Sequence, residues 1–132
     1  MAAPRRVFVS HTSEFTKFPE KRSFIDAAVA AVNRAGDVPC DMSYFTARDE
    51  KPAEYCSERV RQCDVYIGII GFRYGSPVRD RPEVSYTELE FETACEMPPK
   101  TRFVFLLDDA AKVPRLFMTW NMVIGRKLFA RD

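Results

Sequence analysis

The run Asp64-Val-Tyr-Ile-Gly-Ile-Ile-Gly71, in which apolar residues are nearly continuous, is the feature that most constrains the fold. Such a run is typical of a parallel β-strand covered on both faces, because both sets of alternating side chains must then be apolar. Parallel strands are joined by crossover connections, which are usually helices. The run therefore predicts helices on either side of this strand and a fold of the α/β class.

The rest of the chain supplies the expected alternation of strands and helices. β-Branched and aromatic runs predict strands at 6–10, 38–42 and 101–107, the last of them buried. Apolar residues at helical spacing predict helices at 18–34, at 52–62 and from Ser85 to before Pro98, the last opening on a capping box formed by Ser85 and Glu88. This order predicts an open parallel sheet with helices on both faces.

Ligands of such sheets bind beyond the carboxyl ends of the strands, where the strand order reverses. Four loops are expected at that edge, and any chemistry is expected on them: Ser10–Phe15, Ser43–Lys51, Gly71–Ser85 and Asp108–Lys112.

Size and charge exclude several classes of function. The 132 residues fit one domain, so we expect a single domain over 1–132. A net charge of +1 argues against a general electrostatic grip on nucleic acid or on a membrane surface. No apolar run approaches the ~18 residues of a membrane span. The stretch Gly125–Arg131 reads as the opening of a helix, so we expect the chain to be the N-terminal fragment of a longer protein.

The four cysteines form no C-x-x-C pair and the chain has one histidine, so we expect no metal site. We interpret the cysteines as small core residues in a reducing, cytoplasmic compartment, without a redox role. They are Cys40, Cys56, Cys63 and Cys95.

Glu90 is the strongest catalytic candidate. Acidic residues are common at a helix N-terminus, which accounts for Glu88. Helical spacing, however, puts Glu90 on one stripe with Tyr86 and Ala94, which are expected to face inward. A carboxylate on an inward stripe near the strand ends is a candidate functional group.

Further candidates lie on the same edge of the sheet. The run Ser10-His-Thr-Ser13 follows the first strand and can supply hydroxyl groups to a ribose or phosphate. His11 itself is a candidate ligand contact or acid–base group, although a loop histidine bonded to its own backbone is an alternative. Phe45 can stack on a base or simply hold its loop in place. The turn Gly71-Phe-Arg-Tyr-Gly75 lacks a P-loop pattern, and its Arg73 is either an anion contact or an exposed arginine.

Several segments together resemble Toll/interleukin-1 receptor (TIR) domains: Val7–His11, Arg48-Asp49, Cys63–Gly71 and Ser85–Glu90. The resemblance covers roughly residues 5–130. It is closer to the TIR-like domain of unknown function that begins many bacterial proteins, whose signature Arg73-Tyr-Gly75 and Ser85–Glu90 resemble. It implies a flavodoxin-type three-layer α/β sandwich with a central parallel sheet of four to five strands.

The resemblance also implies a function. In TIR domains that cleave NAD a glutamate follows a tryptophan by four residues, and here Glu90 follows Tyr86 at that spacing. Nucleoside deoxyribosyltransferase-like proteins carry a similar Thr-x-x-Glu, matched by Thr87 and Glu90. We therefore expect Glu90 to be catalytic, with Ser10, His11, Phe45, Arg73, Tyr86 and Thr87 binding NAD as substrate and with no cofactor required.

The resemblance thus implies a signalling domain of a bacterial immune protein of the antiphage type that hydrolyses NAD when clustered. Two alternatives are a non-catalytic protein–protein interaction module and a deoxyribosyltransferase-like nucleoside binder. An enzyme needs Glu90 beside a ligand-sized crevice, whereas an interaction module does not. The expected partners are other TIR-type domains and C-terminal signal-transducing NTPase or repeat modules of the full-length protein.

Overall fold

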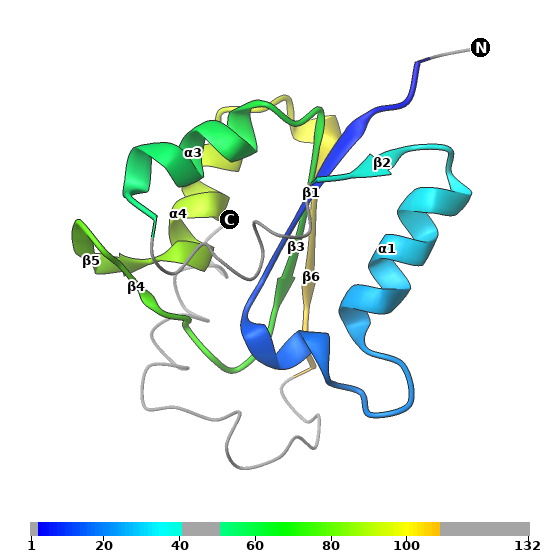
Figure 1. The fold of residues 1–132 in the computed structure, drawn as a ribbon, viewed down its shortest axis with the longest axis horizontal. Helices are drawn as coiled ribbons and strands as arrows, with labels where there is room; N and C mark the ends of the chain where they lie inside the picture. Colours follow the sequence, from blue (N-terminus) through cyan, green and yellow to red (C-terminus); the bar gives the residue numbers. More distant parts are fainter. Residues whose placement is uncertain (1–2, 41–50, 109–132) are drawn as a thin grey trace.

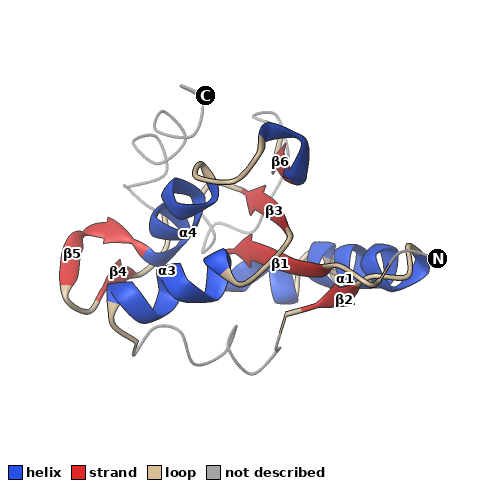
Figure 2. Cartoon of the chain, turned by 90° about the horizontal axis from the view of Figure 1, so that it is seen from above, coloured by secondary structure: helices blue, strands red, loops and turns tan. Residues whose placement is uncertain are grey.

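A computed structural model describes residues 3–40 and 51–108. Its centre is a parallel four-stranded sheet in the order β2-β1-β3-β6 (Figure 1). Helix α1 covers one face, and α3 and α4 cover the other (Figure 2), which confirms the three-layer α/β prediction. The elements are β1 (Arg6–His11), η1 (Ser13–Thr16), α1 (Phe24–Arg34), β2 (Val38–Pro39), α3 (Ala53–Arg61), β3 (Val65–Ile70), β4 (Pro77–Val78), β5 (Arg81–Ser85), α4 (Tyr86–Ala94), η3 (Pro99–Thr101) and β6 (Arg102–Leu106).

The alternation of side chains along β1 and β3 divides the core into two clusters. Val7, Val9 and Val65 pack with α1, whereas Phe8 and Tyr66 pack with α3 and α4. The Phe8 and Tyr66 rings stack with their centroids 6.4 Å apart. Both faces of the central strands are therefore buried, as the apolar runs predict.

The strand order reverses between β1 and β3, because β1 pairs with β2 on one side and with β3 on the other. Ser10, near the carboxyl end of β1, is in register with Gly68 of β3. The crevice position of an open α/β sheet lies beyond the ends of these two strands.

Helix α1 begins later than the sequence pattern predicts. The prediction placed its start near Phe18, whereas the structure places it at Phe24. Ser23 is the N-cap, and its hydroxyl accepts a hydrogen bond from the Asp26 backbone N–H at 3.0 Å. The local capping bond therefore determines where the helix starts, and the apolar residues before Ser23 lie in the segment that leads into it.

A small hairpin replaces part of the expected loop after β3. Strands β4 and β5 pair in antiparallel fashion. The Asp80 carboxylate at the hairpin turn accepts a 2.7 Å bond from the Ala53 N–H, at the first turn of α3. The hairpin thereby connects the N-terminus of α3 to that of α4, which directly follows β5.

The prediction that the last strand is buried is wrong for β6. Its side chains Phe103, Val104, Phe105 and Leu106 are 40–60% exposed. The reason is its position, since β6 is the outer strand of the sheet formed by the described residues.

The interpretation of the cysteines as unpaired core residues is also corrected. Cys40, directly after β2, and Cys63, two residues before β3, are joined as a disulfide. Cys56 is a buried free thiol, as expected, whereas Cys95 is exposed. The predictions for Phe45 and for the segment 109–132 lie outside the described residues.

Candidate functional site

Glu90 and Ser10 form a buried hydrogen-bonded pair between α4 and β1. The Ser10 hydroxyl donates to Glu90 Oε1 at 2.7 Å, and both residues have no exposed surface. They are 80 residues apart in the sequence. Burial of a carboxylate is costly unless hydrogen bonds stabilise it, and the Ser10 hydroxyl provides one such bond. The pair lies near the point where the strand order reverses.

Gly68 makes room for an aromatic side chain next to this pair. A β-carbon at Gly68 would lie 2.7 Å from the Tyr66 hydroxyl oxygen, which no real side chain allows. The Tyr66 phenol therefore lies along the strand over Gly68, and Gly68 is the register partner of Ser10. Glycine at this position is required by the close approach of the phenol.

Tyr86 lies on the inward stripe of α4 one turn before Glu90, as predicted, and is buried. Its hydroxyl donates to the Lys51 carbonyl oxygen at 2.7 Å and accepts from the Arg79 N–H at 3.2 Å. These bonds tie the entry of α3 to the β4–β5 hairpin. The Tyr86 hydroxyl thus has a structural role in this state of the molecule.

Thr87 is buried one turn before Glu90 on the same side of α4. His11 is buried at the end of β1, and its Nδ1 lies 2.8 Å from the Thr12 carbonyl oxygen, so the histidine contacts its own backbone. Strand alternation puts His11 on the α1 face, opposite Ser10. The structure therefore brings Thr87, but not His11, to the Glu90 side.

Arg73 lies in the loop between β3 and β4 and is half-buried. Within residues 3–40 and 51–108 its guanidinium forms neither a hydrogen bond nor an ion pair. Its role as an anion contact stays a prediction.

Tyr74 is a residue of this site that the sequence analysis missed as a contact. Ser85 caps α4 by accepting from the Glu88 N–H at 3.1 Å, as predicted. The returning half of the capping box passes through Tyr74, whose hydroxyl accepts from the Ser85 N–H at 3.3 Å and donates to Glu88 Oε2. The sequence shows only that Tyr74 precedes the capping box, and this order alone does not predict a contact between them.

Glu88, in the first turn of α4, is an acidic group whose protonation is strongly perturbed. Burial, the negative charge of Glu92 one turn later and a hydrogen bond between the two carboxyl groups raise the pKa of Glu88 to about 7. Glu88 is on the helix face away from Glu90, as predicted from the spacing.

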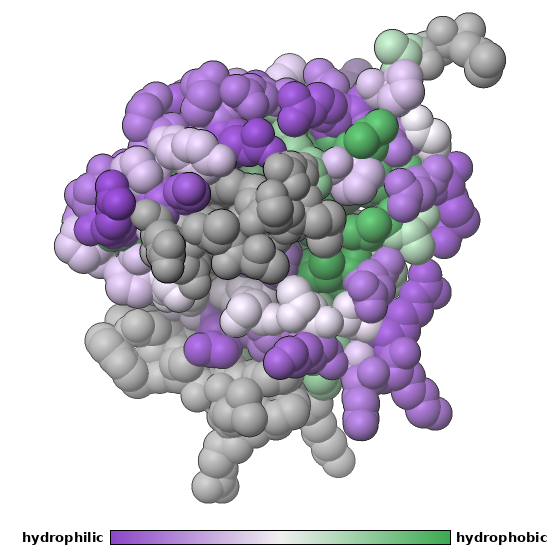
Figure 3. Space-filling view, in the orientation of Figure 1, coloured by the Kyte–Doolittle hydropathy of each residue, from purple (hydrophilic) through white to green (hydrophobic). Residues whose placement is uncertain are grey.

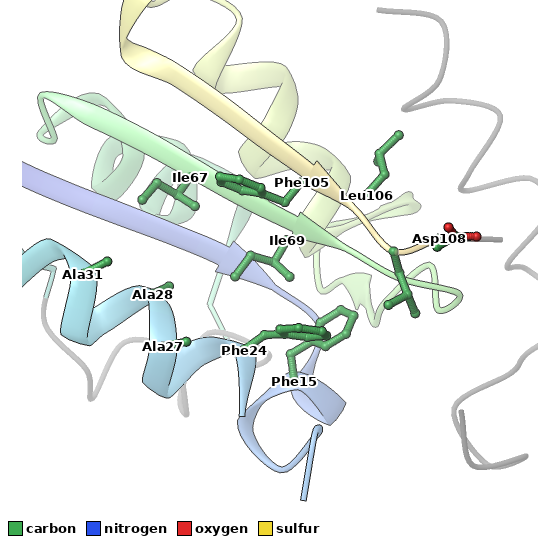
Figure 4. Close-up of a pocket in the computed structure, with 11 residues that line it drawn as sticks. Phe15, Phe24, Ala27, Ala28, Ala31, Ile67, Ile69, Phe105, Leu106 and Asp108 are labelled. Atoms are coloured by element: carbon green, nitrogen blue, oxygen red, sulfur yellow. The ribbon is translucent and has the colours of Figure 1, made fainter. Parts of the chain in front are cut away.

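A large hollow lies on the opposite face of the sheet from Glu90. Its volume is about 530 Å³, and it opens between α1 and strands β3 and β6 (Figure 4). On the face drawn in Figure 3, hydrophobic side chains also gather between α1 and the sheet. Among its described lining residues, Asp108 supplies the only charged side chain. The lining residues are Phe15, Phe24, Ala27, Ala28, Ala31, Ile67, Ile69, Phe105, Leu106, Leu107 and Asp108. This hollow is therefore not the crevice that the enzyme hypothesis requires beside Glu90.

Two searches over the described residues bear on other kinds of site. No group of three or more His, Cys, Asp or Glu side chains within 3–40 and 51–108 is placed to hold a metal ion. None of the helices in that same part of the chain is long and apolar enough to cross a membrane.

Comparisons with known proteins identify the fold and the family. The chain is similar to a solved structure described as a prokaryotic SEFIR domain, with a TM-score of 0.54 and 13% identity. That match covers 96% of this chain and 90% of the other, and it supports the TIR-like fold. No curated protein matches the chain. A family model described as "Domain of unknown function (DUF4062)" matches residues 6–120, so the chain belongs to the DUF4062 family.

Proposed function

We propose that this chain is a TIR-like signalling domain that hydrolyses the nicotinamide N-glycosidic bond of NAD⁺, with Glu90 as its catalytic carboxylate. The observation that carries the proposal is the Glu90–Ser10 pair, a buried carboxylate at the strand-order reversal of a parallel sheet. Ligands of open α/β folds bind at this position.

The cost of burying Glu90 supports a functional role. A carboxylate without exposed surface loses its hydration, and an apolar residue of similar size would fill the same space without that loss. Local conflicts with stability of this kind are expected at functional sites.

One carboxylate is sufficient for this particular reaction. Most glycosidases need a second acid, because their leaving group departs as an alkoxide and must be protonated. The nicotinamide nitrogen of NAD⁺ already carries a positive charge, so nicotinamide leaves as a neutral molecule with the bonding electron pair. Water then bonds to the ribose C1′ and releases a proton, giving ADP-ribose. Glu90 would stabilise the positive charge that develops on the ribose ring.

The burial of Glu90 also supports dependence on clustering. An isolated chain with Glu90 fully covered is expected to bind substrate poorly, and contact between domains is proposed to open the site. In the full-length protein a C-terminal NTPase or repeat module would impose that contact after sensing infection. This role in bacterial immunity follows from the family resemblance, and the opening from the zero exposure of Glu90.

The test is chromatographic assay of NAD⁺ cleavage with the chain held on beads or fused to an oligomerisation tag, beside Glu90→Ala. We expect nicotinamide and ADP-ribose from the native chain alone. Equal cleavage by both forms would move the chemistry away from Glu90. No cleavage under enforced clustering would exclude NAD⁺ as the substrate of this chain.

The second candidate is a non-catalytic interaction module, and one observation favours it. The apolar hollow of about 530 Å³ lies beside β6, whose apolar side chains are exposed. Exposed apolar surface of this kind marks protein contacts. Inactive chains that nevertheless co-sediment in a concentration-dependent manner would support this candidate over the first.

A further inference from the structure

Two buried threonines beside Gly75, Thr12 and Thr87, carry hydroxyl groups without a hydrogen-bond partner among the described residues. Thr12 and Thr87 are 4% and 2% exposed. Neither Thr12 Oγ1 nor Thr87 Oγ1 has a hydrogen-bond partner within the part of the chain that the structure describes. Most buried hydroxyl groups in proteins are paired, so two unpaired ones in one place require an explanation.

Gly75 holds the two threonines together. A β-carbon at Gly75 would lie 3.1 Å from Thr87 Oγ1 and 3.2 Å from Thr12 Cγ2, so both side chains pack against the glycine. Its φ of +103° is also a conformation that glycine adopts without strain. The loop after β3 therefore comes close to β1 and α4 at this point, and the two threonines meet there.

The positions of the threonines relate them to Glu90. Thr12 follows Ser10 by two residues in extended backbone, which puts both on the same side of the strand. Thr87 precedes Glu90 by three residues, which puts both on the same side of α4. From the rise of each element, the threonines lie about 5–7 Å along from the Ser10–Glu90 contact. That distance is comparable to the width of a sugar ring.

We infer that Thr12 and Thr87 bind the hydroxyl groups of the ribose whose C1′ faces Glu90. This inference rests on the proposed function and adds the residues that recognise the sugar. A threonine hydroxyl donates one hydrogen bond and accepts others, as each hydroxyl of a ribose does. A phosphate is disfavoured here, because the buried Glu90 carboxylate is close and would repel it. The free guanidinium of Arg73 is the better contact for the pyrophosphate.

Replacement of each threonine by valine separates this role from simple packing. Valine keeps the shape and the β-branch and removes the hydroxyl. If the hydroxyls await a ligand, Thr12→Val and Thr87→Val lose ligand affinity and gain stability, because an unpaired buried polar group disappears. We expect the unfolding midpoint of each variant to rise by about 2–6 °C.

Thr93→Val is the matched control on the same helix. The Thr93 hydroxyl is buried but paired: it donates to the Leu89 carbonyl oxygen at 2.9 Å and accepts from the Ser57 hydroxyl at 3.0 Å. Its removal is expected to lower the unfolding midpoint and to leave ligand affinity unchanged.

Affinity is measured by calorimetric titration of the 132-residue chain, fused to the oligomerisation tag of the cleavage assay so that the site is open, with ADP-ribose and with ADP, which lacks the second ribose. Thr12→Val and Thr87→Val should each weaken ADP-ribose binding about 5- to 10-fold and leave ADP binding unchanged. The KM for NAD⁺ of the clustered chain should rise by the same factor.

Each outcome separates this inference from the proposed function. Threonine-dependent binding of ADP-ribose without NAD⁺ cleavage would support the hydroxyl pair and exclude the hydrolase. Cleavage of NAD⁺ with unchanged KM and affinity in both valine variants would overturn the hydroxyl pair alone. Lower unfolding midpoints in both variants would also overturn it, because the hydroxyls would then have partners in the folded chain. Failure of the native chain to bind ADP-ribose would exclude a ribose at this position.

Discussion

The two faces of the sheet differ in what they bury at the same depth. On the α1 face the side chains between helix and sheet are apolar and leave a hollow of about 530 Å³. On the opposite face a carboxylate and three hydroxyl groups lie beneath α4, and Glu90 has no exposed surface. Neighbouring residues of β1 contribute to the two faces, since Val9 faces α1 and Ser10 faces α4.

We therefore expect the α1 face to contribute mainly to stability and the α4 face to carry the chemistry. The α1 face is mainly apolar, and its irregularities are the buried His11 at the end of β1 and a gap in the packing. The α4 face contains buried polar groups, whose loss of hydration lowers the free energy of unfolding and which a purely structural core would not contain. Substitutions on the first face should therefore change stability, and those at Glu90 should change activity.

The largest expected effect on stability is Phe15→Ala on the α1 face. Phe15 is 1% exposed, and its ring lies 5.6 Å from that of Phe24 between centroids. Truncation of a buried phenylalanine lowers the free energy of unfolding by about 3–5 kcal/mol. Urea unfolding measures this loss, with Phe105→Ala as the control. Because Phe105 is 60% exposed, a loss as large in the control would contradict the assignment of the core.

Glu90→Gln tests the opposite face. The amide oxygen of glutamine still accepts a bond from Ser10, so the fold should be kept and its unfolding midpoint unchanged or raised. Removal of the charge should lower the rate of NAD⁺ cleavage about 10²- to 10³-fold. Glu92→Gln, on the exposed side of the same helix, is the control and should keep the rate. A similar loss in both variants would mean that overall helix charge, not Glu90, supports the reaction.

The fold was largely predictable because its signals are local. The apolar run of β3 and the capping residue Ser85 each determine their own element, and both predictions are confirmed. The inward stripe of Tyr86, Glu90 and Ala94 is confirmed for the same reason. The boundary of α1 was missed because the bond from Ser23 outweighs the apolar pattern before it.

The contacts of the site were not predictable, because they join residues far apart in the sequence. The Ser10–Glu90 bond spans 80 residues, and spacing within α4 selects Glu90 without naming its partner. Thr12 lies in the run Ser10–Ser13 that the sequence offers as a source of hydroxyl groups, but its packing beside Gly75 and Thr87 was not predictable. His11 was expected beside Ser10 in the site, but neighbours in a strand point to opposite faces.

Tyr86→Phe tests whether Tyr86 contributes to stability rather than to substrate binding, although it lies one turn before Glu90 on α4. Loss of the hydroxyl leaves the Lys51 carbonyl and the Arg79 N–H without their present partner. We expect the free energy of unfolding to fall by about 1–3 kcal/mol. Tyr55→Phe, at an exposed position, should change it by less than about 0.5 kcal/mol. Unchanged stability with a higher KM for NAD⁺ would instead place Tyr86 in the substrate site.

The smallest effect concerns Glu88, a perturbed carboxyl on the same helix as Glu90. Because its pKa rises from 4.5 to about 7 on folding, the folded chain holds this proton more tightly than the unfolded chain. Its contribution to stability is therefore complete below pH 4.5 and is lost as the pH rises through about 7. Glu88→Gln should match the native chain at low pH and exceed it by about 1–2 kcal/mol above neutrality, since Glu88 is only partly desolvated.

Urea unfolding at a series of pH values measures this difference, and Glu92→Gln sharpens it. Loss of the Glu92 charge lowers the pKa of Glu88, so the decline in stability should move to lower pH without disappearing. A parallel pH dependence in the native chain and in Glu88→Gln would show that another group titrates in this range. If the Glu88 dependence is confirmed while the NAD⁺ cleavage rate of Glu88→Gln stays at the native value, the two acids of α4 have separate roles. In that case Glu88 affects the pH dependence of stability at the N-terminus of α4, and Glu90 is the group that acts on the substrate.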